Sequence, residues 1–219
     1  MIEKIVPSYV VAVDTTEASL DGALFPEEET VIAAAVEKRR REFTNGRICA
    51  RHALQRLGEP SAPVMAGDRG EPLWPDGVVG SITHCSGYCG AVLGRRSTIA
   101  AIGIDAERHA ALSPHLRAMV AVPDEQAMLD RLLAQDSGIR WDRVLFSAKE
   151  AVYKAWYPLT GRWLGFRDAR LVIERDGTFS ARLPVDGSGP DAFSGRWLVE
   201  DGLILTAIVV GTGFRDAKA

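Results

Sequence analysis

The sequence predicts an α+β protein in which two halves each combine a long helix with a group of strands. Three observations lead to this prediction. The segments follow one another in the order strand, helix, strands, and then helix, strands. The later strands are joined by turn pairs such as Asp176-Gly177 and Asp201-Gly202, which connect antiparallel neighbours. With 219 residues, of which 47% are hydrophobic, the chain suits one compact unit or two small, tightly joined halves.

The first half is expected to contain a strand, a long helix and then three strands. An apolar strand is predicted at residues 8–13. Residues 26–58 carry acids in the first turn and bases further on, as the helix dipole favours, so we expect a helix with a break at Asn45-Gly46. Residues 59–77 are rich in proline and glycine and predict a loop that wraps the surface or borders a site. Runs of β-branched and small residues then predict three strands of one sheet, at residues 78–85, 87–94 and 97–107.

The second half is expected to hold another helix followed by antiparallel strands. A mixed segment with proline and helical pieces is predicted at residues 108–140. The stretch VLFSAKEAVYKAW at residues 144–156 reads as an amphipathic helix. Antiparallel strands joined by turns are predicted after it, within residues 164–185, 193–202 and 203–213.

The charged residues of that second helix have a purely structural interpretation. Ser147 and Glu150 fit the S-x-x-E capping box that opens many helices. Glu150 and Lys154 stand four residues apart, which is the spacing of a surface ion pair. From this segment alone, the structural interpretation is favoured over a catalytic one.

Composition and charge narrow the class of protein. No run of about 18 apolar residues could cross a bilayer, and the N-terminus lacks a basic segment followed by a long apolar one, so we expect a cytoplasmic protein without a membrane partner. The net charge of −3 argues against general nucleic-acid binding but leaves room for a local basic pocket. Cys49, Cys85 and Cys89 are odd in number and irregularly spaced, which argues against a disulfide framework or a structural zinc site.

Two carboxylates, Asp105 and Glu107, end an apolar strand. In a strand, residues two apart point to the same face. Carboxylates so placed repel each other unless they are solvated or bridged by a cation, and Mg²⁺ prefers oxygen ligands of this kind. A solvated strand end explains the pair about as well.

Donor groups for an anion occur in two other segments. Thr83 and His84 offer a hydroxyl and an imidazole close to Gly80, although a lone histidine is more often a structural residue. Arg47 and Arg51 share a helix face and are suited to grip phosphate, although a run of charges is usually a solvated face.

Taken together, these segments match the motifs of a single protein family. The stretches GSITHCSGYCGAVLG, GIDAE and WDRVLFSAKEAVYKAW resemble, in order and approximate spacing, the three motif regions of the Sfp-type 4′-phosphopantetheinyl transferases. The resemblance extends to RRREFTNGRICAR, GDRGEPLWPDG and WYPLTGRWLGF, and it points to PptT-like and EntD-like members, above all actinobacterial ones that serve fatty-acid and polyketide carriers. Because three ordered motifs are more specific than one, the resemblance favours a catalytic role for Glu150.

The resemblance implies a fold, a reaction and its partners. The fold is a pseudo-dimer of two similar α/β halves, residues 1–102 and 103–219, with the active site in the cleft between them. The reaction moves the 4′-phosphopantetheine group of coenzyme A to a serine of apo acyl or peptidyl carrier protein domains and releases adenosine 3′,5′-bisphosphate. The carriers belong to fatty-acid, polyketide or nonribosomal peptide synthases, including those that make siderophores. Mg²⁺ is the expected cofactor, with Mn²⁺ as an alternative, and the chain is expected to be a monomer.

The resemblance also implies roles for individual residues. Asp105, Glu107 and Glu150 correspond to the metal site that holds the coenzyme A pyrophosphate, and Glu150 is the candidate general base. Asp105 and Lys154 complete the catalytic set, with Lys154 near the pyrophosphate. The remaining nucleotide-binding positions are Arg39, Arg47, Gly67, Asp68, Arg69, Thr83 and His84. One position departs from the expected pattern: Ala66 stands where a lysine is expected, so Arg69 carries more of the phosphate binding.

Two rival interpretations come from other classes of function. The chain could be a catalytically weak module that binds coenzyme A or a carrier protein, but all three carboxylates are present and binding alone requires no base. Another Mg²⁺-dependent transferase acting on a different nucleotide would share the carboxylates, yet it has no reason to keep the THC and AKEA segments together.

Overall fold

The computed structural model describes residues 1–16, 20, 22–184 and 189–213. The first part of the chain contains η1 (Ile2–Ile5), β1 (Val11–Thr15), α1 (Pro26–Val31), α2 (Glu37–Arg56), β2 (Met65–Ala66), β3 (Pro72–Leu73), β4 (Val78–Cys85) and β5 (Tyr88–Arg95). The second part contains β6 (Ile99–Arg108), α3 (Pro114–Val120), α4 (Pro123–Gln135), α5 (Trp141–Thr160), β7 (Arg170–Ile173), β8 (Thr178–Arg182), β9 (Ala192–Glu200) and β10 (Leu203–Gly211). The predicted α+β class is confirmed. Residue 185, the last of one predicted strand, lies outside the described residues.

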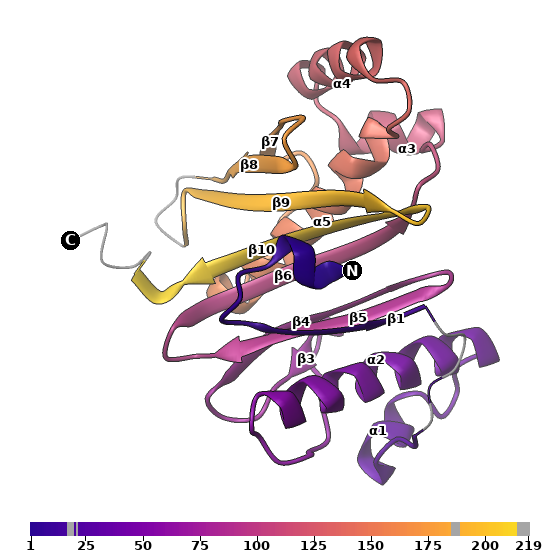
Figure 1. Cartoon of the computed structure of the whole chain (residues 1–219), viewed down its shortest axis with the longest axis vertical. Helices are drawn as coiled ribbons and strands as arrows, with labels where there is room; N and C mark the ends of the chain where they lie inside the picture. The colour runs from indigo at the N-terminus through magenta and orange to yellow at the C-terminus, as the bar shows by residue number, and fades with distance from the viewer. Residues whose placement is uncertain (17–19, 21, 185–188, 214–219) are drawn as a thin grey trace.

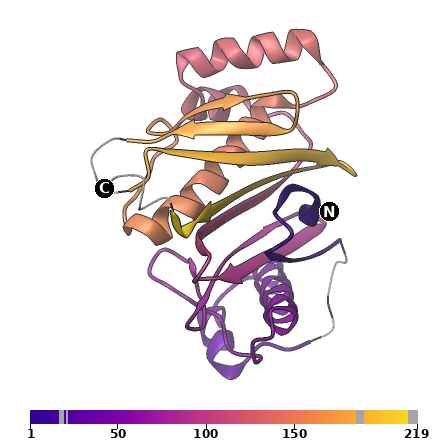
Figure 2. The ribbon, with the colours of Figure 1, turned by 60° about the vertical axis from the view of Figure 1, so that its left-hand side comes forward.

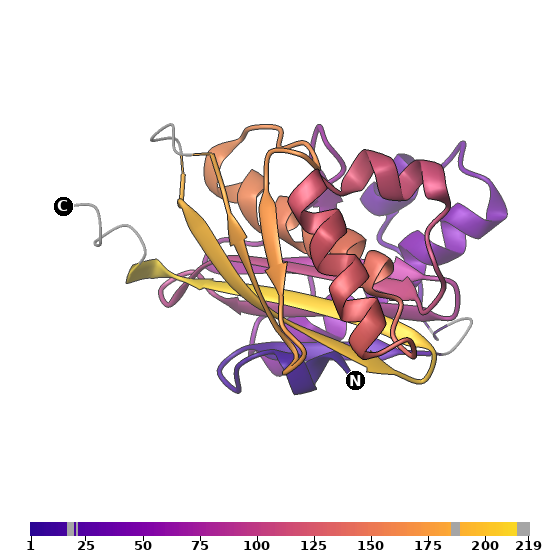
Figure 3. The ribbon, with the colours of Figure 1, turned by 90° about the horizontal axis from the view of Figure 1, so that it is seen from above.

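Two antiparallel sheets form the framework, with a two-stranded ribbon of β2 and β3 beside them. The first sheet has the order β1-β5-β4 and is covered by α2, while the second has the order β6-β10-β9-β8-β7 and is covered by α5 (Figures 1 and 2). In the view from above, α3, α4 and α5 lie on one side of the larger sheet and η1 lies on the other (Figure 3). The two sheets meet where β4 runs beside β6.

The prediction that residues 78–85, 87–94 and 97–107 form one sheet was wrong. β4 and β5 pair with each other, but β6 pairs with β10 over its whole length. Between β4 and β6, the backbone N–H of Ile104 donates to the hydroxyl of Ser81 at 3.2 Å, in place of a strand ladder. The predicted boundary between residues 102 and 103 falls inside β6, and the division into two similar halves stays a prediction.

The predicted helix at residues 26–58 is divided, but not at Asn45-Gly46. The break falls at residues 32–36, between α1 and α2. Gly46 lies inside α2, where an added Cβ would come within 3.1 Å of the Ile82 side chain on β4. This glycine therefore allows the helix to pack closely on the sheet, and Asn45 is bound through its side chain to the backbone of Leu20.

The capping-box interpretation of Ser147 was also wrong. The helix α5 begins at Trp141, so Ser147 lies in its interior, fully buried, with its hydroxyl 2.9 Å from that of Thr206 on β10. The helix comes close to the larger sheet because Gly103 has no side chain: a Cβ there would overlap the carbonyl oxygen of Ala151. This close approach brings the polar face of α5 to the end of β6.

The remaining predictions about the chain as a whole concern cysteines and membranes. Cys49, Cys85 and Cys89 are all free, as their number and spacing predict. Of the helices that the structure describes, none is both long enough and apolar enough to span a membrane.

Candidate active site

A cleft of about 610 Å³ lies between the two parts of the chain. One wall is formed by the loop that carries Arg69, by Trp74 and by β4; the other wall is formed by α5, with β6 between them. Glu150 and Lys154 line the α5 wall, so the cleft brings these two predicted residues together with Arg69. Three separate segments of sequence therefore contribute to one cavity.

The carboxylates at the end of β6 both point toward α5. Asp105 accepts a hydrogen bond from Lys154 at 2.8 Å, and Glu107 accepts one from Arg143 at 2.8 Å. The same-face prediction is thus confirmed. Since Asp105 is 6% exposed, the interpretation of this position as a solvated strand end was wrong.

Glu150 lies one helical turn before Lys154 on the same side of α5. Lys154 pairs with Asp105 and also donates to the carbonyl of Ile104 at 3.0 Å, so the predicted surface ion pair between Glu150 and Lys154 is not formed. Burial and the negative charge of Asp105 raise the pKa of Glu150, against the opposing effect of Lys154. The same two causes raise the pKa of Glu107, although Arg143 acts against them.

One oxygen of this cluster has an unsatisfied requirement for a partner. Asp105 Oδ2 is buried and accepts no hydrogen bond, while Oδ1 already binds Lys154. A buried carboxylate oxygen without a donor is costly, and a bound cation would satisfy it. Within the described part of the chain, no three Asp, Glu, His or Cys side chains are already gathered closely enough to hold a metal ion. The unpartnered carboxylate oxygen of Asp105 fits a hard cation, and Glu107, on the same face of the strand, is bound by Arg143.

His84 and Thr83 face opposite sides of β4. The hydroxyl of Thr83 points to Asp105 at 3.4 Å, whereas His84 Nε2 lies 3.1 Å from the guanidinium of Arg39 on α2. Arginine only donates, so Nε2 accepts and the ring proton is assigned to Nδ1, which faces Glu42 at 3.8 Å. Burial lowers the pKa of His84, and the charges of Arg39 and Lys154 act in the same direction, against the opposing effect of Glu42. The structure thus brings His84 and Arg39 together, beside a second hollow of about 260 Å³.

The predicted arginine pair of α2 is engaged inside the protein. Arg51 forms a buried ion pair with Glu28 at 2.8 Å. Arg47 donates through Nε to the carbonyl of Val64 at 2.6 Å and stacks over the ring of Phe43. Burial lowers the pKa of Arg47 to about 10. The pair holds α1 and the loop that follows α2 against α2, which leaves Arg51 unavailable to a ligand.

The loop with Gly67, Asp68 and Arg69 turns between β2 and β3. The side chain of Glu71 accepts from the backbone of Arg69 at 2.9 Å, and a Cβ on Gly67 would overlap that carboxylate. Arg69 lines the cleft, but Gly67 and Asp68 do not. Gly67 therefore shapes the turn that presents Arg69.

Three aromatic residues line the cleft in addition to the predicted ones. Tyr153 and Tyr157 line the α5 wall, with ring centroids 5.9 Å apart, and Tyr153 also packs on Trp163 at 5.0 Å. Trp74 faces them from the opposite wall and donates to the carbonyl of Gly80 at 2.9 Å. The i, i+4 spacing of the two tyrosines, one turn after Glu150, was an available signal.

Lys149, next to Glu150 in the sequence, has a different role. Its ammonium group is buried and donates to Glu125 at 2.7 Å and to the carbonyls of Val120 and Phe166. Glu125 in turn caps α4 through the backbone of Val122. This network fixes α5 to its neighbours behind the cleft.

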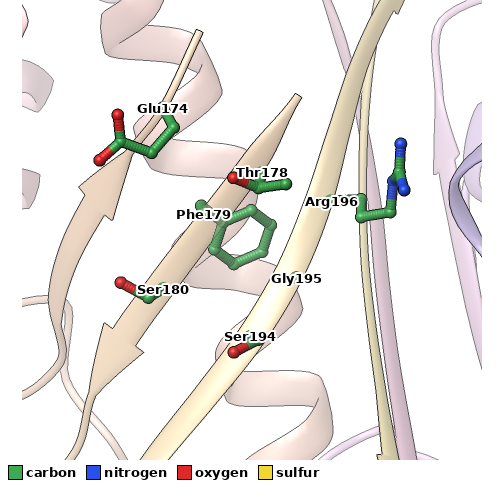
Figure 4. A pocket seen from close by; sticks show the side chains of 7 residues that line it. All are labelled: Glu174, Thr178, Phe179, Ser180, Ser194, Gly195 and Arg196. Carbon is green, nitrogen blue, oxygen red and sulfur yellow. The ribbon is translucent and has the colours of Figure 1, made fainter. Parts of the chain in front are cut away.

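A further hollow, of about 410 Å³, lies on β8 and β9 (Figure 4). None of the predicted site residues lines it. Glu174 and Arg196 are the charged side chains that line it, together with Thr178, Ser180 and Ser194. It contains no group of carboxylates and no base beside a nucleophile. The cleft is therefore the better candidate for an active site.

Comparisons with known proteins agree with the sequence motifs. The family model described as "4'-phosphopantetheinyl transferase N-terminal domain" matches residues 27–94, and the model described as "4'-phosphopantetheinyl transferase superfamily" matches residues 101–208. The curated protein "4'-phosphopantetheinyl transferase PptT" of Mycobacterium tuberculosis is 52% identical over 195 residues, which cover 84% of this chain and 85% of the relative. "4'-phosphopantetheinyl transferase Svp" of Streptomyces mobaraensis is 49% identical over 219 residues, covering 96% of this chain and 89% of the relative.

A more distant relative matches a shorter stretch. "Enterobactin synthase component D" of Salmonella typhimurium is 41% identical over 128 residues, which cover 57% of this chain and 51% of the relative. The two actinobacterial relatives, by contrast, match along most of their own length. By these matches, the chain belongs to the 4′-phosphopantetheinyl transferase superfamily.

Proposed function

We propose that this protein transfers the 4′-phosphopantetheine group of coenzyme A to a serine hydroxyl of apo carrier proteins and releases adenosine 3′,5′-bisphosphate. Its partners are acyl and peptidyl carrier domains of fatty-acid, polyketide or nonribosomal peptide synthases, including those of siderophore synthesis. It acts as a monomer in the cytoplasm and depends on Mg²⁺, with Mn²⁺ as an alternative. The observation that carries the proposal is the buried, unpartnered Oδ2 of Asp105, whose other oxygen binds Lys154 in the wall of a cleft that Glu150 also lines.

Asp105 and Glu150 are the residues that would hold the cation, with Glu107 as a third carboxylate. When bound, the cation would neutralise charge on the pyrophosphate oxygens of coenzyme A. Lys154 lies at this position already, since its ammonium group binds Asp105, and Arg69 faces it across the cleft. These two cationic side chains bind and orient the phosphates from opposite walls.

Arg39 and His84 are suited to the 3′-phosphate of coenzyme A. They lie 3.1 Å apart, and a phosphate oxygen can accept from both once the hydrogen bond between them is exchanged. The dianion would favour the protonated imidazole, because an opposite charge stabilises the charged form. Arg47 is buried next to this region. Its Nε–H group already donates to the carbonyl of Val64, so Arg47 contributes positive charge and cannot use Nε to bind the phosphate.

The uncharged part of coenzyme A requires a different surface. The pantetheine arm is a chain of amides and methylenes, and the cleft offers the aromatic faces of Trp74, Tyr153 and Tyr157. Aromatic walls with a few polar groups are typical of sites for such ligands. The arm can therefore lie along the cleft while its phosphate end meets Lys154.

Glu150 is the proposed general base. A serine oxygen attacks the β-phosphorus, the bond from that phosphorus to the departing 3′,5′-bisphosphate breaks, and the serine proton passes to a carboxylate. The pKa of Glu150 is raised and therefore lies closer to neutral pH than that of an exposed glutamate. A carboxylate with a higher pKa is a stronger proton acceptor. The same side chain is a candidate cation ligand, and Glu150→Gln removes both the charge that a ligand needs and the basicity that a proton acceptor needs.

The release of adenosine 3′,5′-bisphosphate tests this proposal. Chromatography should detect the nucleotide when the protein, coenzyme A and Mg²⁺ are mixed with an apo carrier, and not when the carrier serine is replaced by alanine. Chelation by EDTA should abolish release, and added Mn²⁺ should restore it. If the protein instead bound coenzyme A tightly without carrier-dependent release, the rival binding module would be supported.

A further inference from the structure

Arg143 connects the end of β6 to the first turn of α5. Its guanidinium donates to Glu107 Oε2 at 2.8 Å, to the carbonyl of Ala110 at 3.0 Å and to that of Ala111 at 3.3 Å. It also lies over the ring of Phe146, with 5.8 Å between the guanidinium carbon and the ring centroid. Three directed hydrogen bonds and an aromatic contact fix this side chain in one orientation.

The contact between Arg143 and Glu107 is partly shielded from water. The side chains of Arg143 and Glu107 are 19% and 24% exposed, so their attraction is screened less than that of a surface pair. Glu107 is two residues from Asp105 on the same face of the strand. Glu107, the next carboxylate along β6 from Asp105, is thus bound to the guanidinium of Arg143.

We propose that Arg143 is a positioning residue that competes with a divalent cation for Glu107 and thereby sets the cation affinity of the site. The proposal rests on the cation site of the proposed function. Glu107 bound to Arg143 is not free to approach a cation held by Asp105 and Glu150. Releasing Glu107 adds a third carboxylate and one net negative charge to the site.

Two substitutions of Arg143 separate the release of Glu107 from the change in charge. Arg143→Gln removes the guanidinium and its charge, and affinity for Mn²⁺ alone should increase about tenfold, as expected when a nearby opposing charge is lost. Arg143→Lys keeps the charge but replaces a three-way fork with a single flexible ammonium. Its contact with Glu107 should loosen, and the affinity should increase about threefold.

The partner substitution tests whether Arg143 acts through Glu107. In a Glu107→Gln background, Arg143→Gln should increase the affinity by no more than about threefold, because only the charge remains to be removed. Arg117→Gln is the matched control: it also removes one arginine charge, from an ion pair with Asp130 on α3 and α4. Its affinity for Mn²⁺ should equal that of the native protein.

The experiment is a titration of each protein with Mn²⁺ alone, followed by electron paramagnetic resonance of the free ion, with circular dichroism to verify the fold. The expected result is tighter binding by both Arg143 variants and a smaller gain in the Glu107→Gln background. If both variants bind Mn²⁺ like the native protein or more weakly, Arg143 is only a structural connection or orients Glu107 as a ligand, and the proposal is overturned. If Mn²⁺ does not bind, or binds Asp105→Asn as well as the native protein, no cation site exists at Asp105 and the proposal is also overturned. Carrier-dependent transfer of phosphopantetheine is a separate measurement and would distinguish this result from failure of the proposed function.

Discussion

Asp105→Asn keeps the size of the side chain and removes its charge. In the native protein Oδ1 binds Lys154 at 2.8 Å and the buried Oδ2 has no hydrogen-bond donor. Asparagine retains an oxygen for Lys154 but replaces the second oxygen with an amide nitrogen, which donates hydrogen bonds and does not bind a hard cation. The variant therefore changes the proposed chemistry while leaving the shape of the site in place.

The expected effects on activity and on stability differ widely. Loss of one charge that stabilises the transferring phosphates should lower kcat by a factor of about 100 to 1,000. The Lys154 side chain is 28% exposed, and the ion pair contributes no more than about 1 kcal/mol to the free energy of unfolding. Relief of repulsion with Glu107 and Glu150 opposes even that loss, so Tm should shift by no more than about 2–4 °C.

The substitution should also change the titration of its neighbours. Asp105 raises the pKa of both Glu107 and Glu150, so both values should fall in the variant. A raised pKa in the folded state means that the unfolded chain loses its proton first, and the free energy of unfolding decreases as pH rises from the ordinary value of 4.5 through the raised one. In Asp105→Asn this decrease should be smaller.

Three measurements check these expectations: steady-state transfer at limiting Mg²⁺, thermal unfolding followed by circular dichroism, and carbon-13 NMR titration of the glutamate carboxyls. Near-native turnover with an unchanged circular dichroism spectrum would refute a role for Asp105 in the reaction. Unchanged titration of Glu107 and Glu150 would refute their electrostatic coupling to Asp105.

The other predictions concern Glu150, His84 and Lys149. Glu150→Gln should abolish kcat with little change in Tm, and an intact kcat with reduced stability would contradict the catalytic role. His84→Ala should lower kcat/KM for coenzyme A by about 10- to 150-fold but hardly affect dephospho-coenzyme A, whereas equal losses would rule out recognition of the 3′-phosphate. NMR should place the pKa of His84 below its ordinary value of 6.5, so the stability linked to His84 is present above pH 6.5 and is lost as pH falls from 6.5 through the lowered pKa; a value above 6.5 in the free protein would contradict the burial argument. Lys149→Met should lower the free energy of unfolding by about 3–5 kcal/mol in urea titrations because Glu125 stays buried without its cation, and a loss below about 1 kcal/mol would contradict this.

Local sequence patterns correctly predict those features of the fold that depend on the periodicity and order of helices and strands. The alternation of a strand predicts that Asp105 and Glu107 share a face, and both do contact α5. Antiparallel strands after α5 follow from turn pairs and are present as β7 to β10. The α+β class follows from the order of these segments.

The failures occurred where distant residues decide the structure. Asn45-Gly46 predicted a helix break, but Gly46 lies inside α2, where the absence of a side chain allows close packing against Ile82 on β4. Ser147 and Glu150 matched a capping box, yet α5 begins six residues before Ser147 because its interior packs on Thr206 and Gly103. No local pattern specifies such contacts across the chain.

The same limit applies to the partners of charged side chains. The spacing of Glu150 and Lys154 suggested an ion pair, whereas Lys154 binds Asp105, 49 positions away in sequence. No sequence pattern singles out Arg143, because its contact is with Glu107, which lies far away in the sequence at the end of β6. Of the residues that the motifs predict, Arg69, Glu150 and Lys154 line the cleft. The contacts of these side chains depend on the folded arrangement.

Mass spectrometry of an apo carrier protein, after incubation with this protein, coenzyme A and Mg²⁺, tests the central claim most directly. The account predicts that one carrier serine gains the mass of a phosphopantetheine group, and that the gain is absent with Asp105→Asn or with EDTA. Unmodified carriers from fatty-acid, polyketide and nonribosomal peptide synthases, in samples where the protein is folded and binds coenzyme A, would contradict it.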